Sequence, residues 1–337
     1  MLNFDEKQYL QLGKDAYALR EEVEKLADTL YKKGIDNIFF IASGGSLAVT
    51  QTFEYIWRTK SKIPVYSEIA AEVVLKENKQ LTEKSLVILQ SKSGDTKETV
   101  AAAKYLKEKG IPTVGIVRVA GSPLDEVVDY SIVEKVENFA GSDPENMVLY
   151  FLLFRLLYNN NEFPEYNKFA AELKNLPAAL VSVREQADKK AEEFAAKYKD
   201  ETYQLWIGSG SLWGKTYSYA MCVLEEMQWI KSKSIQAPEY FHGTLEIVEE
   251  DTCVVLIKGE DETRCLCDRV ENFTKQYSKK FTVLDTKDYI TEGISDEFRV
   301  IIGQVIVTAI VDRISVYLEK YRDHSLDIRR YYRVLEY

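Results

Sequence analysis

The chain has 337 residues and a formal net charge of −10, and 46% of its residues are hydrophobic. At roughly 100–200 residues per domain, this length predicts two domains, and the apolar fraction suffices for a sizeable core. The acidic balance disfavours binding of nucleic acid through its backbone phosphates, so we expect any bound phosphate to be small and held by a local site. No continuous apolar stretch reaches the length of about 18 residues that suggests a membrane span, so no membrane association is expected.

Two further features bear on compartment and cofactors. The start, MLNFDEKQYLQL, has no basic region followed by an apolar run, so it does not resemble a secretory signal. The four cysteines have no framework spacing, which favours reduced thiols and a cytoplasmic location. Two distant histidines and these scattered cysteines do not supply a set of metal ligands, and SGGSLA lacks the GxGxxG nucleotide pattern. Neither a metal nor another cofactor is therefore expected.

The first half of the chain predicts strands alternating with helices. Its apolar runs are continuous, as in parallel strands buried on both faces. The predicted elements are a helical region over 5–33, a strand over 36–43, a helix over 44–59, a strand over 85–91, a helix over about 95–109 and a strand over 110–121. This order favours a doubly wound α/β layer structure.

The same alternation restarts in the second half, after a helical region over about 144–198 in which Pro177 marks a break. The predicted elements are strands over 203–210, 252–259 and 279–285, with helices over 212–230, up to about 277, and over about 296–320. We therefore divide the chain into a first domain (1–160), a helical connector (161–198), a second domain (199–320) and a C-terminal tail (321–337).

An internal repeat relates the two halves. IASGGSLA (41–48) matches IGSGSLWG (207–214) at an offset of 166 residues. LVILQSKSGDTKET (86–99) matches VVLIKGEDET (254–263), with Gly94 against Gly259 at an offset of 165. Two matches at nearly one spacing predict two copies of one α/β subdomain, each a mainly parallel sheet flanked by helices.

The loop SKSGDT (91–96) is the first candidate site. It follows a buried strand and precedes a helix, whose N-terminal amides attract an anion. Hydroxyls of Ser91, Ser93 and Thr96 add donors, and Gly94 lets the backbone approach a ligand. We predict a phosphate monoester here, against the alternative that Ser93 or Asp95 only caps a helix.

Neighbouring residues extend this candidate site. ASGGS (42–46) ends the adjacent strand and contributes Gly45 and Ser46, although Ser46 could equally be an N-cap. Lys92 could add charge or face solvent. In the second copy the loop KGEDET (258–263) carries three carboxylates, which we expect to repel a phosphate.

SGGS, SKSGDTKET and the duplication together resemble the sugar isomerase (SIS) domain, a phosphosugar-binding fold. The resemblance covers nearly the whole chain and implies two tandem SIS domains. LEEMQWIKSKSIQAPEYFHGTLEIVEEDT (224–252) is similar to the isomerase half of glucosamine-6-phosphate synthase, where a catalytic glutamate lies 16 residues before a histidine, as Glu226 and His242 do here. EMQWI…EYFHG and RDHSLDIRRYYRVLEY (322–337) resemble the fructosamine-6-phosphate deglycases more closely.

One departure argues against the synthase reaction. The synthase tail carries a lysine that forms a Schiff base, and the last 15 residues here contain none. A phosphorylated Amadori compound already carries its nitrogen, so a protein Schiff base would not be required. The resemblance therefore implies cleavage of a fructosamine 6-phosphate to glucose 6-phosphate and an amine.

The resemblance also implies roles for individual residues. Glu226 would move a proton from C1 to C2, with the adjacent Glu225 as an internal control; without the resemblance, a solvent-facing or ion-paired Glu226 would be preferred. His242 would assist ring opening, although a lone histidine is more often structural. Glu239 could orient His242 or water, or be an ordinary loop carboxylate. His324, with Arg329, could touch the amine end of the substrate or a neighbouring subunit, or form plain ion pairs.

Two other functions remain open at this stage. The chain could be an aminosugar-phosphate isomerase or deaminase, or a non-enzymatic phosphosugar sensor. The resemblance further implies a homodimer or higher homo-oligomer, in which His242 could serve the neighbouring subunit's site.

Overall fold

The computed structural model describes residues 1–134 and 143–336, and it separates the chain into two compact units. The N-terminal unit is Lys7–Pro177, and the C-terminal unit comprises Met1–Glu6 and Ala178–Tyr337. The division falls within the segment 161–198 expected to connect the domains. Pro177 lies in the first turn of the long helix α9 (Leu176–Tyr198), where the absent amide hydrogen of proline costs no helical hydrogen bond.

The N-terminal unit is built on a parallel five-stranded sheet with the strand order β2-β1-β3-β4-β5. Its strands are β1 (Asn37–Ala42), β2 (Val65–Ile69), β3 (Ser85–Ser91), β4 (Thr113–Val117) and β5 (Tyr130–Val133). Its helices are α1 (Glu6–Ala18), α2 (Arg20–Lys33), α3 (Gly44–Lys60), α4 (Ala70–Val73), α5 (Lys97–Glu108), α6 (Pro123–Val127), α7 (Asp143–Asn159) and α8 (Tyr166–Glu172), followed by the 3-10 turn η1 (Leu173–Asn175).

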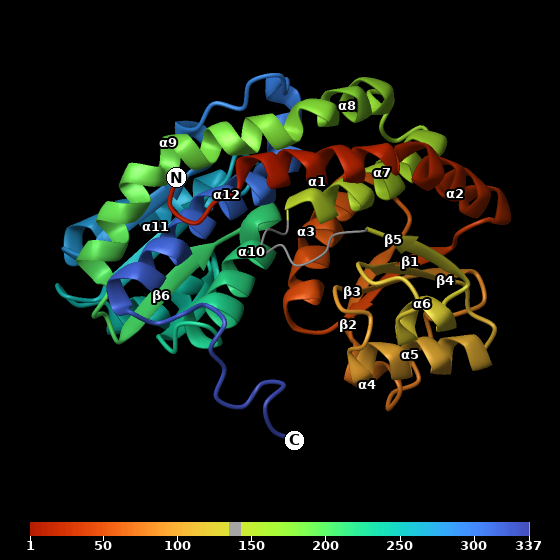
Figure 1. Cartoon of the computed structure of the whole chain (residues 1–337), viewed down its shortest axis with the longest axis horizontal. Coiled ribbons are helices and arrows are strands. Elements are labelled where there is room, and N and C mark those ends of the chain that lie inside the picture. Colours follow the sequence, from red (N-terminus) through yellow and green to blue (C-terminus); the bar gives the residue numbers. More distant parts are fainter. Residues whose placement is uncertain (135–142, 337) are drawn as a thin grey trace. The chain divides into compact units, whose positions relative to one another are not determined.

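Helices cover both faces of this sheet, which explains why β1, β3 and β4 are continuous apolar runs. On one face, Phe39 and Ile41 of β1 pack with side chains of α4, α5 and α6, such as Leu106. Alternate strand residues, such as Phe40, face the other side, where α3 and α7 pack. Figure 1 shows α4, α5 and α6 together on one side of the sheet.

The C-terminal unit repeats this architecture with the strand order β7-β6-β8-β9. Its strands are β6 (Tyr203–Gly208), β7 (Lys231–Gln236), β8 (Cys253–Lys258) and β9 (Phe281–Asp285). Its helices are α9, α10 (Trp213–Ser218), α11 (Arg264–Tyr277) and α12 (Asp296–Arg322), with short turns η2 (Gly210–Leu212), η4 (Glu239–His242), η5 (Thr244–Ile247) and η6 (Thr286–Asp288), and a π-helix η3 (Tyr219–Glu225).

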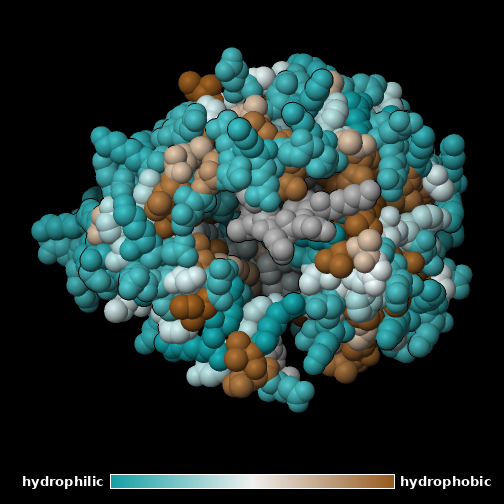
Figure 2. Space-filling view, in the orientation of Figure 1, coloured by the Kyte–Doolittle hydropathy of each residue, from teal (hydrophilic) through white to brown (hydrophobic). Residues whose placement is uncertain are grey.

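Helix α12 is the central helix of the C-terminal unit. It is long and apolar enough to cross a membrane by composition, but 83% of its most apolar window is buried inside the structure. Its two buried arginines are paired, Arg299 with Glu260 and Arg313 with Asp188, as buried charges require. Figure 2 shows a mostly hydrophilic face with apolar residues in separate small groups.

Three strands were not predicted: β2, β5 and β7. All three lie at sheet edges, where one side is unpaired and side chains are partly exposed. The sequence of β7, KSKSIQ, shows why, since its lysines suit an edge strand but hide the apolar signal. The helix predicted over 212–230 is also not regular, because it passes into the π-helix η3 and ends before Trp229, which has φ +55°.

Candidate functional site

The loops after β1 and β3 meet at one end of the N-terminal sheet. Strands β1 and β3 are parallel neighbours, with Ile41 opposite Leu89, and β2 lies on the other side of β1. The chain therefore leaves β1 and β3 on opposite sides of the sheet, which is the arrangement that opens a ligand crevice in doubly wound folds. The two segments predicted to bind phosphate, 42–46 and 91–96, both lie at this crevice.

The 91–96 loop is held in shape by its own hydroxyls. The buried Ser91 Oγ lies 2.9 Å from Thr96 Oγ1 and accepts a hydrogen bond from the Gly94 amide at 3.1 Å. Ser93 Oγ donates to the Asp95 carboxylate. Gly94 has φ +69°, and a Cβ there would lie 2.0 Å from Ser122 Oγ. Only glycine fits this position without strain.

Two helices begin at the crevice, α5 after Thr96 and α3 at Gly44. Gly45 and Ser46 lie in the first turn of α3, whose amide hydrogens have no acceptor within the helix. Lys92 is exposed on the neighbouring loop. Helix N-terminal amides, hydroxyls and a lysine are the donors that bind a phosphate monoester.

A buried carboxyl group that the sequence did not reveal lies near this edge. Glu134 follows β5, is 4% exposed, and its amide donates to the Val117 carbonyl. Burial raises the pKa of Glu134 to about 7, although the positive charges of Arg118 and Lys92 oppose the rise. Arg118 in turn donates its amide to the Lys92 carbonyl, which links β4 to the phosphate-binding loop.

The C-terminal sheet provides an internal comparison. Strand pairing sets Leu86 opposite Ile38 in one sheet and Cys253 opposite Gln204 in the other. Because 41–48 and 207–214 differ by 166 residues, β3 and β8 correspond at an offset of 167. The counterpart of Gly94 is therefore Asp261, and the sequence pairing of Gly94 with Gly259 was wrong by two residues.

Asp261 occupies the anion position of the second sheet. Its Oδ2 accepts hydrogen bonds from the Ser211 amide at 2.9 Å and the Ser211 hydroxyl at 2.6 Å. Its Oδ1 accepts from the amide and hydroxyl of Thr263 at 2.9 and 2.5 Å. These donors correspond to Gly45 and Thr96 in the first sheet.

The backbone before the two helices also matches, since Gly44 has φ +54° and Gly210 has φ +55°. The carboxylates of KGEDET are thus not simply a repulsive surface, as was expected. Asp261 is 6% exposed and bound as an internal anion, and Glu260 pairs with Arg299 at 2.7 Å.

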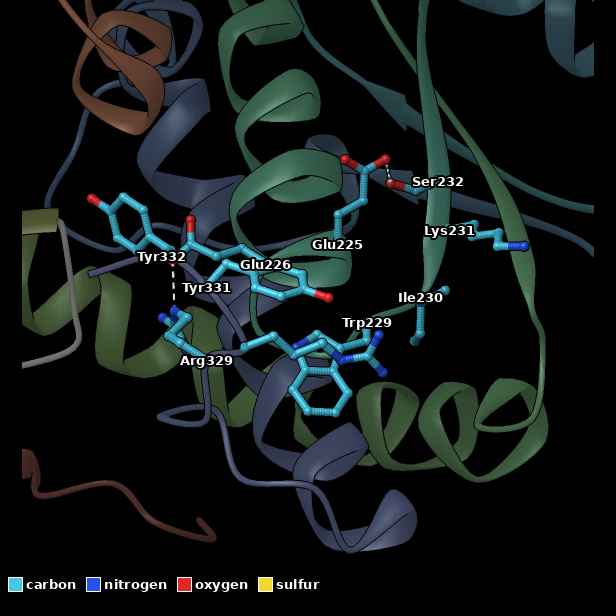
Figure 3. A pocket seen from close by; sticks show the side chains of 10 residues that line it. Glu225, Glu226, Trp229, Ile230, Lys231, Ser232, Arg329, Tyr331 and Tyr332 are labelled. Carbon is cyan, nitrogen blue, oxygen red and sulfur yellow. Dashed lines mark hydrogen bonds and ion pairs between the residues drawn. The ribbon is translucent and has the colours of Figure 1, made fainter. Parts of the chain in front are cut away.

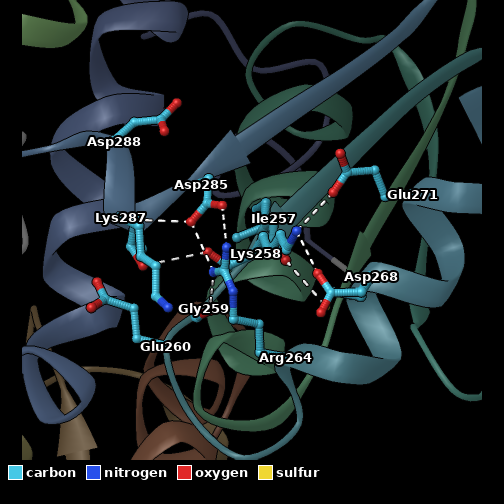
Figure 4. Close-up of polar contacts among 12 residues, drawn as sticks. Ile257, Lys258, Gly259, Glu260, Arg264, Asp268, Glu271, Asp285, Lys287 and Asp288 are labelled. Atoms are coloured by element: carbon cyan, nitrogen blue, oxygen red, sulfur yellow. Dashed lines mark hydrogen bonds and ion pairs between the residues drawn. The ribbon is translucent and has the colours of Figure 1, made fainter.

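Further ion pairs fill the same edge of the second sheet. Lys258, the counterpart of Ser91, pairs with Asp268 at 2.6 Å and Glu271 at 2.7 Å. Arg264 binds Asp285 through two nitrogens, at 2.9 and 2.5 Å. Figure 4 shows these side chains converging beyond β8 and β9.

Glu226 lies at the end of the π-helix η3. Its amide donates to the Met221 carbonyl, five residues earlier, at 3.0 Å, and such widened turns are frequent at functional sites. Its Oε1 accepts from Arg329 Nε at 2.9 Å. Glu225 points to the other side of the helix, where it accepts from Ser232 Oγ at 3.1 Å (Figure 3).

A cavity of about 700 Å³ opens beside the two glutamates. Its wall comes from the end of η3, the start of β7 and the C-terminal tail. The lining residues are Glu225, Glu226, Trp229, Ile230, Lys231, Ser232, Arg329, Arg330, Tyr331 and Tyr332.

The other predicted residues lie elsewhere in the C-terminal unit. Glu239 and His242 are exposed at the two ends of η4 and do not line this cavity. The ring of His324 packs against Trp229 with centroids 4.3 Å apart, and its carbonyl accepts from Gln228 Nε2 at 2.8 Å. His324 therefore anchors the start of the tail. In residues 1–134 and 143–336 there is no group of three or more His, Cys, Asp or Glu side chains arranged for a metal ion.

Comparison with known proteins agrees with this architecture. Residues 29–142 match the SIS domain family. The chain is 36% identical to the fructosamine deglycase of Bacillus subtilis (strain 168), over 95% of this chain and 98% of that protein. It is 25% identical to the fructoselysine 6-phosphate deglycase of Escherichia coli (strain K12), over 92% and 89% of the two chains.

The fold agrees as well. A crystal structure described as a phosphosugar isomerase of Bacillus subtilis matches with a TM-score of 0.89 and 33% identity, over 96% of this chain and all of that one. Sequence, fold and site therefore place this chain in the fructosamine deglycase family of SIS-domain proteins.

Proposed function

We propose that this enzyme hydrolyses fructosamine 6-phosphates to glucose 6-phosphate and a free amine or amino acid. The observation that carries the proposal is the crevice between β1 and β3, where the donors that bind Asp261 in the second sheet have counterparts with no carboxylate among them. A phosphate monoester supplies the missing anion. We further propose that residues 1–160 bind the phosphosugar, that 199–320 supply the catalytic groups, and that 161–198 and 321–337 are connector and tail.

The phosphate would be bound by the hydroxyls of Ser91, Ser93 and Thr96, the first-turn amide of Gly45 and the hydroxyl of Ser46. Lys92 would contribute long-range attraction, since its side chain is exposed. This dianion would fix the position of the sugar chain, which in its open form presents C1 and C2 for proton transfer.

Glu226 would act as the base. In an open-chain fructosamine, C1 carries the nitrogen and C2 is a carbonyl, so removal of a C1 proton gives an enaminol. Return of a proton to C2 gives an imine at C1, and addition of water to the imine releases the amine and leaves the aldehyde of glucose 6-phosphate. One carboxylate that reaches both carbons performs both proton transfers.

The test uses fructoselysine 6-phosphate and measures glucose 6-phosphate with a coupled dehydrogenase. Glu226→Gln should lower kcat by about 100-fold or more, the usual contribution of a general base, and Glu225→Gln by only a few-fold. Equal losses would remove the assignment of Glu226. Ammonia release from glucosamine 6-phosphate alone would instead indicate an aminosugar-phosphate isomerase or deaminase, and binding without any product a sensor.

We infer that the enzyme is a cytoplasmic homodimer or larger homo-oligomer, in which His242 assists ring opening and Glu239 orients it. Support comes from the exposure of both side chains and from their absence from the cavity beside Glu226. If His242 serves a neighbouring subunit, mixing Glu226→Gln with His242→Ala protein should restore activity that neither has alone. Light scattering gives the oligomeric state, and a monomer with full activity would contradict the inference.

A further inference from the structure

The C-terminal tail places a guanidinium group directly against the proposed base. Arg329 Nε donates to Glu226 Oε1 at 2.9 Å, and the two side chains are 18% and 28% exposed. Arg329 Nη1 donates to the carbonyls of Leu326 and Ile328 at 2.7 and 3.0 Å. The tail's own backbone therefore holds the guanidinium in place.

One edge of this guanidinium is only half used. Nε and Nη2 together form the fork that binds both oxygens of a carboxylate. Nε is bonded to a single oxygen of Glu226, and Nη2 donates to no acceptor in the described parts of the chain. A second carboxylate approaching from the cavity could bind both nitrogens in place of Glu226.

The wall of the cavity suits an anionic ligand of modest size. Arg330 lies over the Trp229 ring, 3.8 Å from its centroid, so a second guanidinium faces the same space. Lys231 is exposed at the rim. Of the two acids that line the cavity, Glu225 already accepts from Ser232 and Glu226 from Arg329.

The pairing of Arg329 with Glu226 also bears on the reaction, given the proposed function. The base must act at C1, the carbon that carries the amine, so the group attached to that nitrogen lies next to Glu226. While Arg329 Nε occupies Glu226 Oε1, that oxygen is not available to accept the C1 proton.

We propose that Arg329 binds the carboxylate of the amino-acid part of the substrate, and that this exchange of partners releases Glu226 for proton transfer. The substrate class is then a fructosamine 6-phosphate whose amine carries a carboxylate. Arg329 thereby selects the substrate and keeps the base occupied until the correct amine is bound.

The test compares two substrates that differ only in this carboxylate: the 6-phosphorylated Amadori adducts of glycine and of methylamine. On the wild-type enzyme, kcat for the glycine adduct should exceed kcat for the methylamine adduct at least tenfold. Arg329→Gln should raise KM for the glycine adduct at least tenfold and should raise kcat for the methylamine adduct, because Glu226 is then unpaired. Arg329→Lys should lie between, since lysine keeps the charge but not the fork.

A matched control removes a distant cation from the same unit. Lys279 is exposed and pairs with Glu250, so Lys279→Gln should leave both substrates unchanged. Circular dichroism and the melting temperature of Arg329→Gln establish that it is folded. If Arg329→Gln slows both adducts equally, or neither, the proposal is overturned while the deglycase function stands. If wild-type enzyme releases no glucose 6-phosphate from either adduct, both fall together.

Discussion

The carboxyl edges of the two sheets have the same framework and opposite contents. At the N-terminal sheet, the turn before α3 and the 91–96 loop present hydroxyls and amides around Gly94. At the C-terminal sheet, the corresponding turn and loop surround Asp261, whose carboxylate receives four hydrogen bonds. One residue at one position therefore decides whether an anion comes from solution or from the chain itself.

The filled edge also indicates how strongly such a cradle holds an anion. Asp261 is almost fully buried, and a buried carboxylate is tolerated only when its oxygens are well paired. The equivalent donors of the open edge are thus built to hold a charged group rather than to cap helices.

The largest effect is expected from a carboxylate placed in the open edge. Ser93→Asp puts a negative charge at the loop, and two like charges about 4 Å apart repel by about 4 kcal/mol at an effective dielectric constant near 20. The affinity for glucose 6-phosphate, measured by calorimetry, should fall about 1,000-fold.

Ser93→Ala is the matched control for this substitution. It removes one hydroxyl donor without adding charge, so the affinity should fall only about tenfold, the usual weight of one hydrogen bond to a charged group. If Ser93→Asp weakened glucose 6-phosphate binding no more than Ser93→Ala does, the phosphate would not lie at this loop.

Emptying the filled edge should cost stability rather than activity. Asp261→Ala leaves the donors of Ser211 and Thr263 without their acceptor, and we expect the free energy of unfolding to fall by about 3 kcal/mol. Sulfate or phosphate should restore part of this loss, because either anion supplies the missing acceptor.

Thermal unfolding with and without 50 mM sulfate, a concentration roughly chosen to saturate a weak site, measures the rescue. Asp251→Asn, which changes an exposed carboxylate of the same unit, provides the comparison. Equal stabilisation of the Asp251 and Asp261 variants by sulfate would show that the cradle does not bind free anions.

The open edge should also give the protein a pH dependence that the filled edge lacks. Burial raises the pKa of Glu134 to about 7, from an ordinary value of 4.5. A raised pKa means that the folded state binds the proton more tightly, so the stabilisation is complete below pH 4.5 and is lost as pH rises through 7. At 1.36 kcal/mol per unit, the loss is at most about 3 kcal/mol.

Glu134→Gln removes this ionisation while keeping the size of the side chain. The variant should match the wild type near pH 5 and exceed its free energy of unfolding at pH 8 by about 2 kcal/mol. Denaturant titrations at the two pH values measure the difference. A stability difference between variant and wild type that does not change with pH would contradict the assignment.

Much of this comparison could be predicted from the sequence, because its signals are local. The runs NIFFIA and SLVILQS are apolar throughout, as buried parallel strands require, and both hydroxyl-rich loops follow directly from them. The duplication was also visible, since IASGG and IGSGS keep the glycine that the turn needs at positive φ.

What the sequence could not predict depends on contacts between distant segments. The role of Asp261 follows from strand register, and a two-residue error hid its correspondence to Gly94. Glu134 follows an edge strand with no apolar run to mark it. The ion pair between Glu226 and Arg329 joins residues 103 positions apart, and no local pattern predicts such a contact.

The smallest expected effects come from one substitution made in both edges. Thr96 and Thr263 are counterparts, and Thr263 Oγ1 bonds Asp261 at 2.5 Å and Ser209 Oγ at 2.5 Å. Thr263→Val should therefore lower the free energy of unfolding by about 1–2 kcal/mol and leave KM unchanged. Thr96→Val should instead raise KM for a fructosamine 6-phosphate about tenfold with little change in melting temperature, because the acceptor of Thr96 is the substrate. Melting curves and steady-state kinetics of both variants separate the two cases. If both variants changed the same quantity, either KM or stability, the two edges would not differ in the source of their anion.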